Sequence, residues 1–174
     1  MTGTRIASIG ALLLGAVGTV AVAQGFVNVR ASLSGYNEVV AVSTSGNGTF
    51  TARIDAANQR IDYEESYDGL EGSVTQSHIH FGAPGTNGAI SVFLCSNLGN
   101  GPAGTQPCPP PPATISGTIT AADVIGPGAQ GIAPGQFDEL VAAIRAGATY
   151  VNIHSTTWTG GEVRGQLAPG KSGQ

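Results

Sequence analysis

The sequence has few charged residues. Asp, Glu, Lys and Arg make up 10% of its 174 residues, and the seven basic residues are spread along the chain without a cluster. Nucleic-acid binding requires a basic patch, so we exclude that class of partner. The acidic residues do gather between residues 62 and 71, but without the Asp/Asn-Gly spacing of an EF-hand calcium loop. We interpret this cluster as a solvated strand edge.

Long hydrophobic runs are also rare, and the longest begins near the start of the chain. Arg5 precedes an uncharged run over residues 6–23 that ends in the small residues AVA, an order typical of a secretory signal peptide. An uncleaved anchor is the alternative, because about 18 apolar residues is close to the minimum that spans a bilayer. We expect cleavage near Ala23. Residues 24–174 should then form a single secreted domain, extracellular or periplasmic, without a transmembrane segment.

Cysteine is scarce as well. Cys95 and Cys108 flank a segment rich in Gly, Pro and Asn that does not fix its own shape. Export makes a disulfide between them the first expectation. Closing a loop of this size contributes about 3 kcal/mol in the chain-entropy model. The alternative is a pair of thiolate metal ligands, which requires a reducing site.

Helical patterns are almost absent, and most of the chain consists of short β-rich segments separated by Gly, Pro or Asn. This pattern predicts an all-β domain, a Greek-key-like β-sandwich or barrel. One inserted helix is predicted at about residues 135–146, where apolar residues recur at helical spacing from Phe137 to Ile144. A short helical turn is expected near residues 120–125.

Histidine occurs three times, always on a predicted strand. In SHIHF, residues 77–81, alternation turns Ile79 toward the core and therefore His78 and His80 together to the opposite face. In YVNIHS, the same rule places His154 on the polar face of a later strand. If the two strands are neighbours, three imidazoles converge on a site that suits copper or zinc, with a fourth position open. The alternative is a structural network in which the histidines only form hydrogen bonds.

One carboxylate breaks the alternation of its strand. Glu65 shares a face with Ile61, Tyr63 and Tyr67, where an apolar side chain is expected. An unpaired carboxylate on an apolar face is strongly unfavourable. We therefore expect either a bulge in the strand or a partner for Glu65 such as an arginine.

Four ordered segments carry a family resemblance: LSGYNEV, SHIHFGAPGTNGAISVFLC, TAADVIGPGAQGI and TYVNIHSTTWTGGEVRGQL. Together they resemble the CHRD domain family, which is named after chordin and includes single-domain secreted bacterial proteins. The resemblance extends from about Val29 to Leu167. It implies an extracellular β-sandwich domain whose biochemical role is poorly defined.

The residues that match the family pattern by position all have polar side chains. They are His78, His80, His154, Glu38, Glu162 and Arg164. We expect the three histidines to bind a copper or zinc ion. The two glutamates and the arginine are expected to form a support network beside them. Arg164 is predicted to clamp one of the glutamates in a bidentate ion pair, because its positive charge is unfavourable among the ligands of a cation.

The sequence lacks a nucleophile elbow, a P-loop and an H-E-x-x-H helix. The predicted function is therefore a secreted metal-binding domain to which we assign no catalysis. The alternative from another class is an adhesion, matrix or protein-interaction module. Such a module would contact extracellular proteins or cell-surface polymers through exposed aromatic residues or the proline-rich loop, and its histidines would be structural.

Overall fold

A computed structural model describes residues 27–170, and the expected signal peptide, residues 1–23, lies outside this range. The described chain contains nine β-strands: β1 (Val27–Ser34), β2 (Asn47–Asp55), β3 (Arg60–Asp68), β4 (Val74–Phe81), β5 (Ala89–Ser96), β6 (Ala113–Ile119), β7 (Thr149–Ser155), β8 (Val163–Gln166) and β9 (Ala168–Pro169). Its helical elements are α1 (Phe137–Arg145) and the 3-10 turns η1 (Gly35–Asn37), η2 (Ala121–Asp123) and η3 (Gly128–Gln130). The predicted all-β domain, with one inserted helix and a short helical turn before it, is confirmed.

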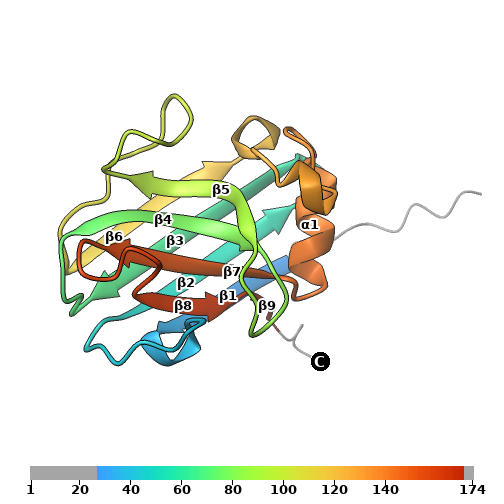
Figure 1. The fold of residues 1–174 in the computed structure, drawn as a ribbon. Helices are drawn as coiled ribbons and strands as arrows, with labels where there is room; N and C mark the ends of the chain where they lie inside the picture. The colour runs from blue at the N-terminus through green and yellow to red at the C-terminus, as the bar shows by residue number, and fades with distance from the viewer. Residues whose placement is uncertain (1–26, 171–174) are drawn as a thin grey trace, which may run out of the picture.

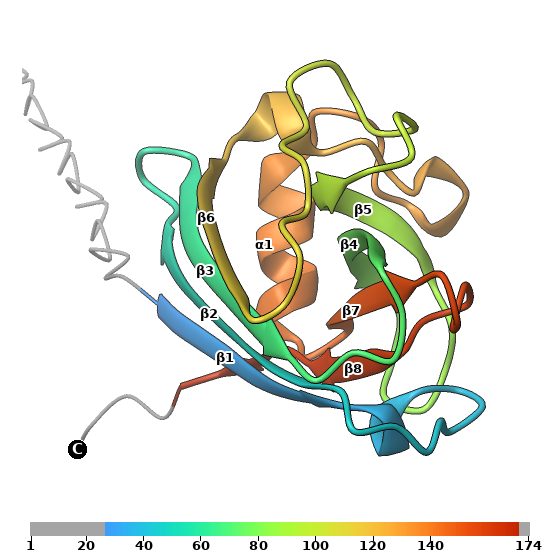
Figure 2. The same cartoon turned by 90° about the vertical axis from the view of Figure 1, so that its left-hand side faces the viewer.

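The strands form one sheet of antiparallel pairs that curls into a nearly closed barrel (Figure 1, Figure 2). Their order is β5-β4-β7-β8-β1-β2-β3-β6, and β9 pairs with β1. In Figure 2 the strands curve around the barrel interior, and Figure 1 shows α1 at one end of the barrel. Because β4 and β7 are direct neighbours, the condition for the histidines to converge is met.

Alternation along the strands builds the core. Every second residue of β2 is buried, among them Phe50 and Ile54. α1 contributes a continuous apolar face that includes Leu140 and Ile144, and both side chains belong to the same cluster. None of the helices in the described part of the chain is long and apolar enough to cross a membrane.

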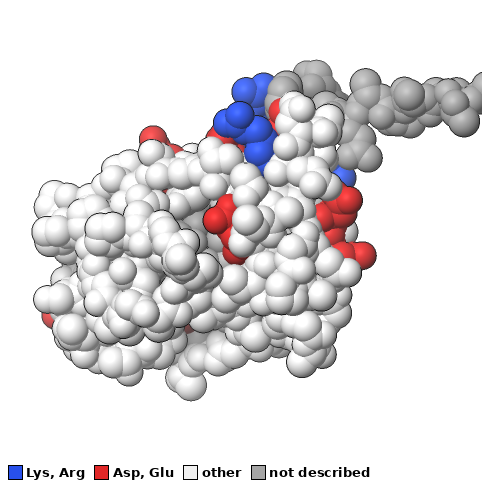
Figure 3. Space-filling view, turned by 90° about the horizontal axis from the view of Figure 1, so that it is seen from above, with Lys and Arg blue, Asp and Glu red and all other residues white. Residues whose placement is uncertain are grey.

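The surface is mainly uncharged. Figure 3 shows the barrel from above, with most of its charged side chains on one half of the face. Arg60 and Asp62 form an ion pair, but about half of each side chain is exposed, so solvent screens their attraction. Burial and hydrogen bonds therefore hold the fold more than ion pairs do.

The two edges of the sheet, β5 and β6, are linked through the loop that carries the disulfide. Cys95 in β5 is bonded to Cys108, as predicted. Inside this loop the side-chain amide of Gln106 donates to Leu94 O in β5 at 3.1 Å and to Ser116 O in β6 at 3.3 Å. The disulfide loop therefore bridges the gap that keeps the barrel from closing.

Replacing both cysteines, in Cys95→Ala/Cys108→Ala, frees this loop. We expect the free energy of unfolding to fall by about 3 kcal/mol, the chain-entropy value for a loop of this size. Urea unfolding of the oxidised wild type and the double variant measures the difference. A reducing agent should move the wild type toward the variant and leave the variant unchanged. Equal stabilities of the two oxidised proteins would contradict the prediction.

Glu65 lies inside the barrel on a regular strand. Pairing of β3 is unbroken, with Glu65 opposite Phe50 of β2 and Ile115 of β6, so of the two alternatives the bulge is absent from this described strand. The side chain is fully buried, and its partner is a serine instead of an arginine: Ser77 Oγ lies 2.8 Å from Glu65 Oε1. Ser77 belongs to β4, which is remote from β3 in the sheet and faces it across the barrel interior.

The contacts of Ser77 indicate that Glu65 is protonated. Ser77 Oγ also lies 3.2 Å from the backbone oxygen of Asn152, which can only accept. Because a hydroxyl has one proton, Ser77 cannot give a full hydrogen bond to both oxygens, whereas a protonated Glu65 that donates to Ser77 would satisfy both contacts. Burial raises the pKa of Glu65 to about 8, against the smaller opposing effect of Ser77 when its hydroxyl donates to the ionised carboxylate. The carboxyl is therefore neutral inside the barrel.

This raised pKa makes stability depend on pH. The unfolded chain ionises Glu65 near pH 4.5, whereas the folded chain keeps its proton up to about pH 8. The stability that Glu65 contributes is therefore fully present below pH 4.5 and is lost as pH rises toward about 8.

We expect Glu65→Gln, which stays neutral, to abolish this loss. Between the two pKa values the variant should gain on the wild type by up to about 1.4 kcal/mol of unfolding free energy per pH unit. Urea unfolding across this pH range measures the difference. Glu64→Gln, which changes the exposed carboxyl next to Glu65, is the control and should follow the wild type. Parallel pH profiles for all three proteins would contradict the neutral state of Glu65.

Candidate metal centre

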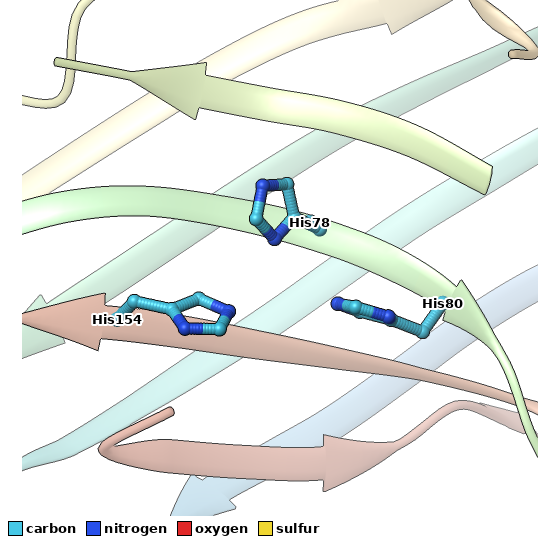
Figure 4. Close-up of side chains that lie close together, drawn as sticks. All are labelled: His78, His80 and His154. Carbon is cyan, nitrogen blue, oxygen red and sulfur yellow. The ribbon is translucent and has the colours of Figure 1, made fainter. Parts of the chain in front are cut away.

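The three histidines lie on the outer face of β4 and β7. Ile79 in β4 and Ile153 in β7 pack in the core, so alternation turns His78, His80 and His154 to the other side. The three rings point toward one another (Figure 4). Ring nitrogens from all three, one from each, lie within 4.8 Å of one another. The predicted convergence is confirmed.

The histidines are buried although they face away from the core. At most 8% of any of the three residues is exposed. The loop over residues 82–88, which follows β4, covers them on one side: Gly82 N donates to Ala148 O before β7, and Gly88 N donates to the Tyr150 hydroxyl. A second loop, residues 35–46, follows β1. We call these two loops the roof of the site.

Arg164 in β8 fastens the roof. Its guanidinium donates to Thr86 O at 2.6 Å and to Asn87 Oδ1 at 3.1 Å. It also stacks on Tyr150, with Cζ 3.3 Å from the ring centroid. The Asn87 amide donates to Val39 O at 3.0 Å, which joins the two loops to each other. Arg164 therefore holds the loops over the histidines through loop acceptors and an aromatic ring.

The predicted ion pair of Arg164 is not formed with either Glu38 or Glu162 among the described residues. Glu162 is fully buried, and its Oε1 accepts from Thr44 Oγ1 and from Glu71 N, both at 2.7 Å. It therefore ties the loop after β1 to the loop after β3. Burial raises the pKa of Glu38 to about 7, against the opposing charge of Arg164. The support residues thus lie around the site, but they do not pair as expected.

Two of the three rings have a defined tautomer. His80 Nδ1 lies 2.9 Å from Gly88 O, and His154 Nδ1 lies 2.9 Å from Thr159 O. A carbonyl oxygen only accepts, so both Nδ1 atoms must donate, and the neutral rings present a bare Nε2. Metal-binding histidines are commonly oriented by a backbone carbonyl in this way.

Several of these nitrogens lack a hydrogen-bond partner. Within residues 27–170, this holds for both ring nitrogens of His78 and for Nε2 of His80. Buried polar atoms are almost always paired in folded proteins, because an unpaired one retains its full desolvation penalty. Three unpaired nitrogens that belong to converging rings fit a bound cation better than a hydrogen-bond network.

Burial keeps the rings uncharged. It lowers the pKa of His78 to about 2, with smaller contributions from the nearby His154 and His80. It also lowers the pKa of His80 to about 4 and that of His154 below its usual range. A metal ion needs deprotonated ligands, so these imidazoles are in the binding form at neutral pH.

Aromatic contacts fix the orientation of the rings. His80 stacks on Tyr150, with ring centroids 4.7 Å apart and an interplanar angle of 2°. His78 meets Phe93 of β5 edge to face at 4.4 Å. Sequence reasoning gave neither aromatic residue a role in the site. Alternation does place Tyr150 on the same face as His154, but the contact with Phe93 depends on the pairing of β4 with β5.

Asn152 is a third side chain to which the sequence analysis gave no role. It lies directly opposite His78 in the pairing of β4 with β7, and it is two residues before His154 on the same face. Its Oδ1 is 3.1 Å from His154 Nε2, and the residue is 3% exposed. The site therefore contains a buried amide beside the three imidazoles.

Gly161 leaves room for two of these side chains. An ideal Cβ on Gly161 would lie 2.5 Å from Glu38 Oε1 and 2.7 Å from Asn152 Nδ2. The residue has a φ of +126°, a conformation that favours glycine. Glycine at this position therefore allows the carboxyl and the amide to lie side by side.

Comparison with known proteins identifies the family. The family model of the CHRD domain matches residues 29–167, a range that contains every residue of the site. None of the curated proteins matches the chain. The function of the site must therefore be argued from its geometry.

Gly161→Ala tests the packing between Glu38 and Asn152. The new methyl group overlaps both side chains and strains the backbone, so we expect a loss of unfolding free energy larger than about 1 kcal/mol. Gly160→Ala is the matched control, because a Cβ there meets no described atom within 4 Å. Urea unfolding of the two variants measures the contrast, and equal destabilisation would show that position 161 is not specially crowded.

Proposed function

We propose that this chain, which belongs to the CHRD domain family, is a metal-binding domain that holds one copper or zinc ion between His78, His80 and His154. One observation carries the proposal: three neutral, buried imidazoles converge, and several of their nitrogens lack a partner among the described residues.

The ligand type selects the metal. Imidazole suits copper and zinc, whereas magnesium and calcium prefer oxygen ligands. Nitrogens bound at about 2.0–2.1 Å to one zinc ion lie roughly 3.4 Å apart in a tetrahedral site. The ligand nitrogens here lie within 4.8 Å of one another, so modest ring movements bring all three into contact with one ion.

The residues around the histidines have a supporting role in this proposal. Arg164 and Glu162 hold the loops that exclude water from the rings, and Glu38 lies beside the Asn152 amide. Exclusion of water strengthens the interaction of the ligands with a cation, because the local dielectric is low. The same burial argues against catalysis, which requires access for a substrate.

The location outside the cytoplasm is part of the proposal. Residues 1–23 have the features of a cleaved signal peptide. The disulfide between Cys95 and Cys108 supports an oxidising compartment, since thiols in the cytosol are kept reduced. In the alternative, an interaction module, the same histidines would bind no metal.

Elemental analysis of the mature protein, purified without a histidine tag, tests the metal site. We expect about one equivalent of copper or zinc in the wild type and none in His78→Ala/His80→Ala, because a single remaining imidazole does not hold the ion. Zinc at about 100 times its dissociation constant should also raise the unfolding free energy of the wild type by about 2.7 kcal/mol.

A surface control separates this site from nonspecific binding. Glu64→Gln/Asp68→Asn removes two exposed carboxylates from β3 and should bind metal as the wild type does. A wild type that contains no metal and takes up none on titration would contradict the proposal and favour the interaction module. If the surface control loses metal binding and the histidine variant keeps it, the metal site lies at the carboxylates of β3 instead.

A further inference from the structure

We propose that Asn152 provides the fourth ligand through its amide oxygen, so that the metal site is closed by the protein itself. This inference rests on the proposed metal site, because it assigns a further residue to the same ion. It replaces the open fourth position that a three-histidine site otherwise leaves for water.

Strand pairing brings Asn152 to the centre of the site. β4 presents His78 and His80 on its outer face, and β7 presents Asn152 and His154 on the same face of the sheet. His78 is directly opposite Asn152, and residues opposite each other on neighbouring strands have Cβ atoms about 5 Å apart. The four side chains therefore form a compact array on two adjacent strands, and Asn152 is a member of it by register.

No proton lies between Asn152 Oδ1 and His154 Nε2. His154 Nδ1 donates to Thr159 O, which leaves Nε2 of the neutral ring with a lone pair. The atom that faces Nε2 at 3.1 Å is Asn152 Oδ1, which also has only lone pairs. Two acceptors at this separation repel each other. A cation that binds both converts the repulsion into two ligand bonds, and about 3.1 Å is close to the spacing of two ligands on one tetrahedral ion.

Rotating the amide by 180° would place Nδ2 toward His154 instead, but Glu38 opposes this rotation. Asn152 Nδ2 and Glu38 Oε1 lie beside each other against Gly161, each within 2.7 Å of the same ideal Cβ position. Glu38 Oε1 is buried and has no hydrogen-bond partner among residues 27–170. In the observed orientation the amide turns its donor toward this acceptor. The rotated amide would place its oxygen against the carboxylate, so the carboxylate form of Glu38 positions the amide and directs Oδ1 toward the histidines.

Burial agrees with a closed site. Asn152 is 3% exposed, and His78 is fully buried. Structural zinc sites have four protein ligands, whereas catalytic sites keep one position for water or substrate. Three imidazoles and one amide oxygen complete a tetrahedral set. The ion would then stabilise the roof and the two strands, and it would not exchange a ligand with substrates.

Cobalt(II) titration of the mature chain tests this inference, because the visible spectrum of cobalt reports its ligands. We expect Asn152→Ala to weaken cobalt binding at least about tenfold, the lower limit for losing even an outer partner of a metal site. The spectrum of bound cobalt should also change. Asn152→Asp/Glu38→Gln supplies an oxygen at the same place, with an amide instead of the Glu38 carboxyl beside its second oxygen, and should restore both the affinity and a four-ligand spectrum. Thr149→Val, which removes a buried hydroxyl from the same strand, is the matched control and should behave as the wild type.

The outcomes separate this inference from the metal site itself. A wild type that binds neither cobalt nor copper or zinc overturns both. Cobalt binding by Asn152→Ala with an unchanged spectrum, whatever its affinity, overturns only the fourth ligand, because a residue that merely positions His154 leaves the ligand set intact. If Asn152→Ala does not fold, a crystal structure of the zinc-loaded wild type decides. A Zn–Oδ1 distance of about 2.0–2.2 Å supports the inference, and a water molecule in that position overturns it.

Discussion

Burial of both faces of β7 is the constraint on which the rest of the structure depends. All seven residues of this strand are buried, yet its outer face carries Tyr150, Asn152 and His154. The inner face packs in the core, as in any barrel. The outer face needs loops that exclude water and also supply acceptors for the ring N–H groups. Gly88 O and Thr159 O supply them, so the loops after β4 and β7 serve as hydrogen-bond partners as well as cover.

Desolvation acts in the same sense on the three histidines, Glu65 and Glu38. It lowers the pKa of the histidines and raises that of Glu65 and Glu38, so each group shifts toward its uncharged form. Arg164 places a positive charge near Glu38, but burial outweighs its effect on the pKa of that carboxyl. The low dielectric would strengthen the interaction of a divalent cation with the ring nitrogens.

Local pattern was enough to predict much of the fold. Alternation gave the faces of His78, His80 and His154, helical spacing gave α1, and the cysteine count in an exported chain gave the disulfide. The strand faces and the helix depend on residues that are close together in sequence. The disulfide joins the two cysteines of the sequence, so no other pairing competes with it. Alternation does not show whether the strands that carry the histidines are adjacent. In the structure they are, because β4 pairs with β7.

Contacts across the barrel and with returning loops could not be predicted in the same way. Glu65 meets Ser77 through the barrel interior, where no strand pairing fixes the partner. Arg164 binds the loop at Thr86 instead of a glutamate because that loop folds back over β8. Alternation in the sequence places Asn152 on the same face as His154. The distance between the two side chains depends on their torsion angles, which the sequence does not give.

The link between the two loops of the roof bears on the kinetics of metal exchange. Asn87 receives a hydrogen bond from Arg164 and donates one to Val39 O, so neither loop can lift while the other stays in place without breaking this link. An ion beneath them would leave only as fast as the loops separate, however weak or strong its equilibrium affinity. Slow opening would favour binding of the metal during folding, before the roof forms. The identity of the bound ion would then depend on the metals present when the chain folded.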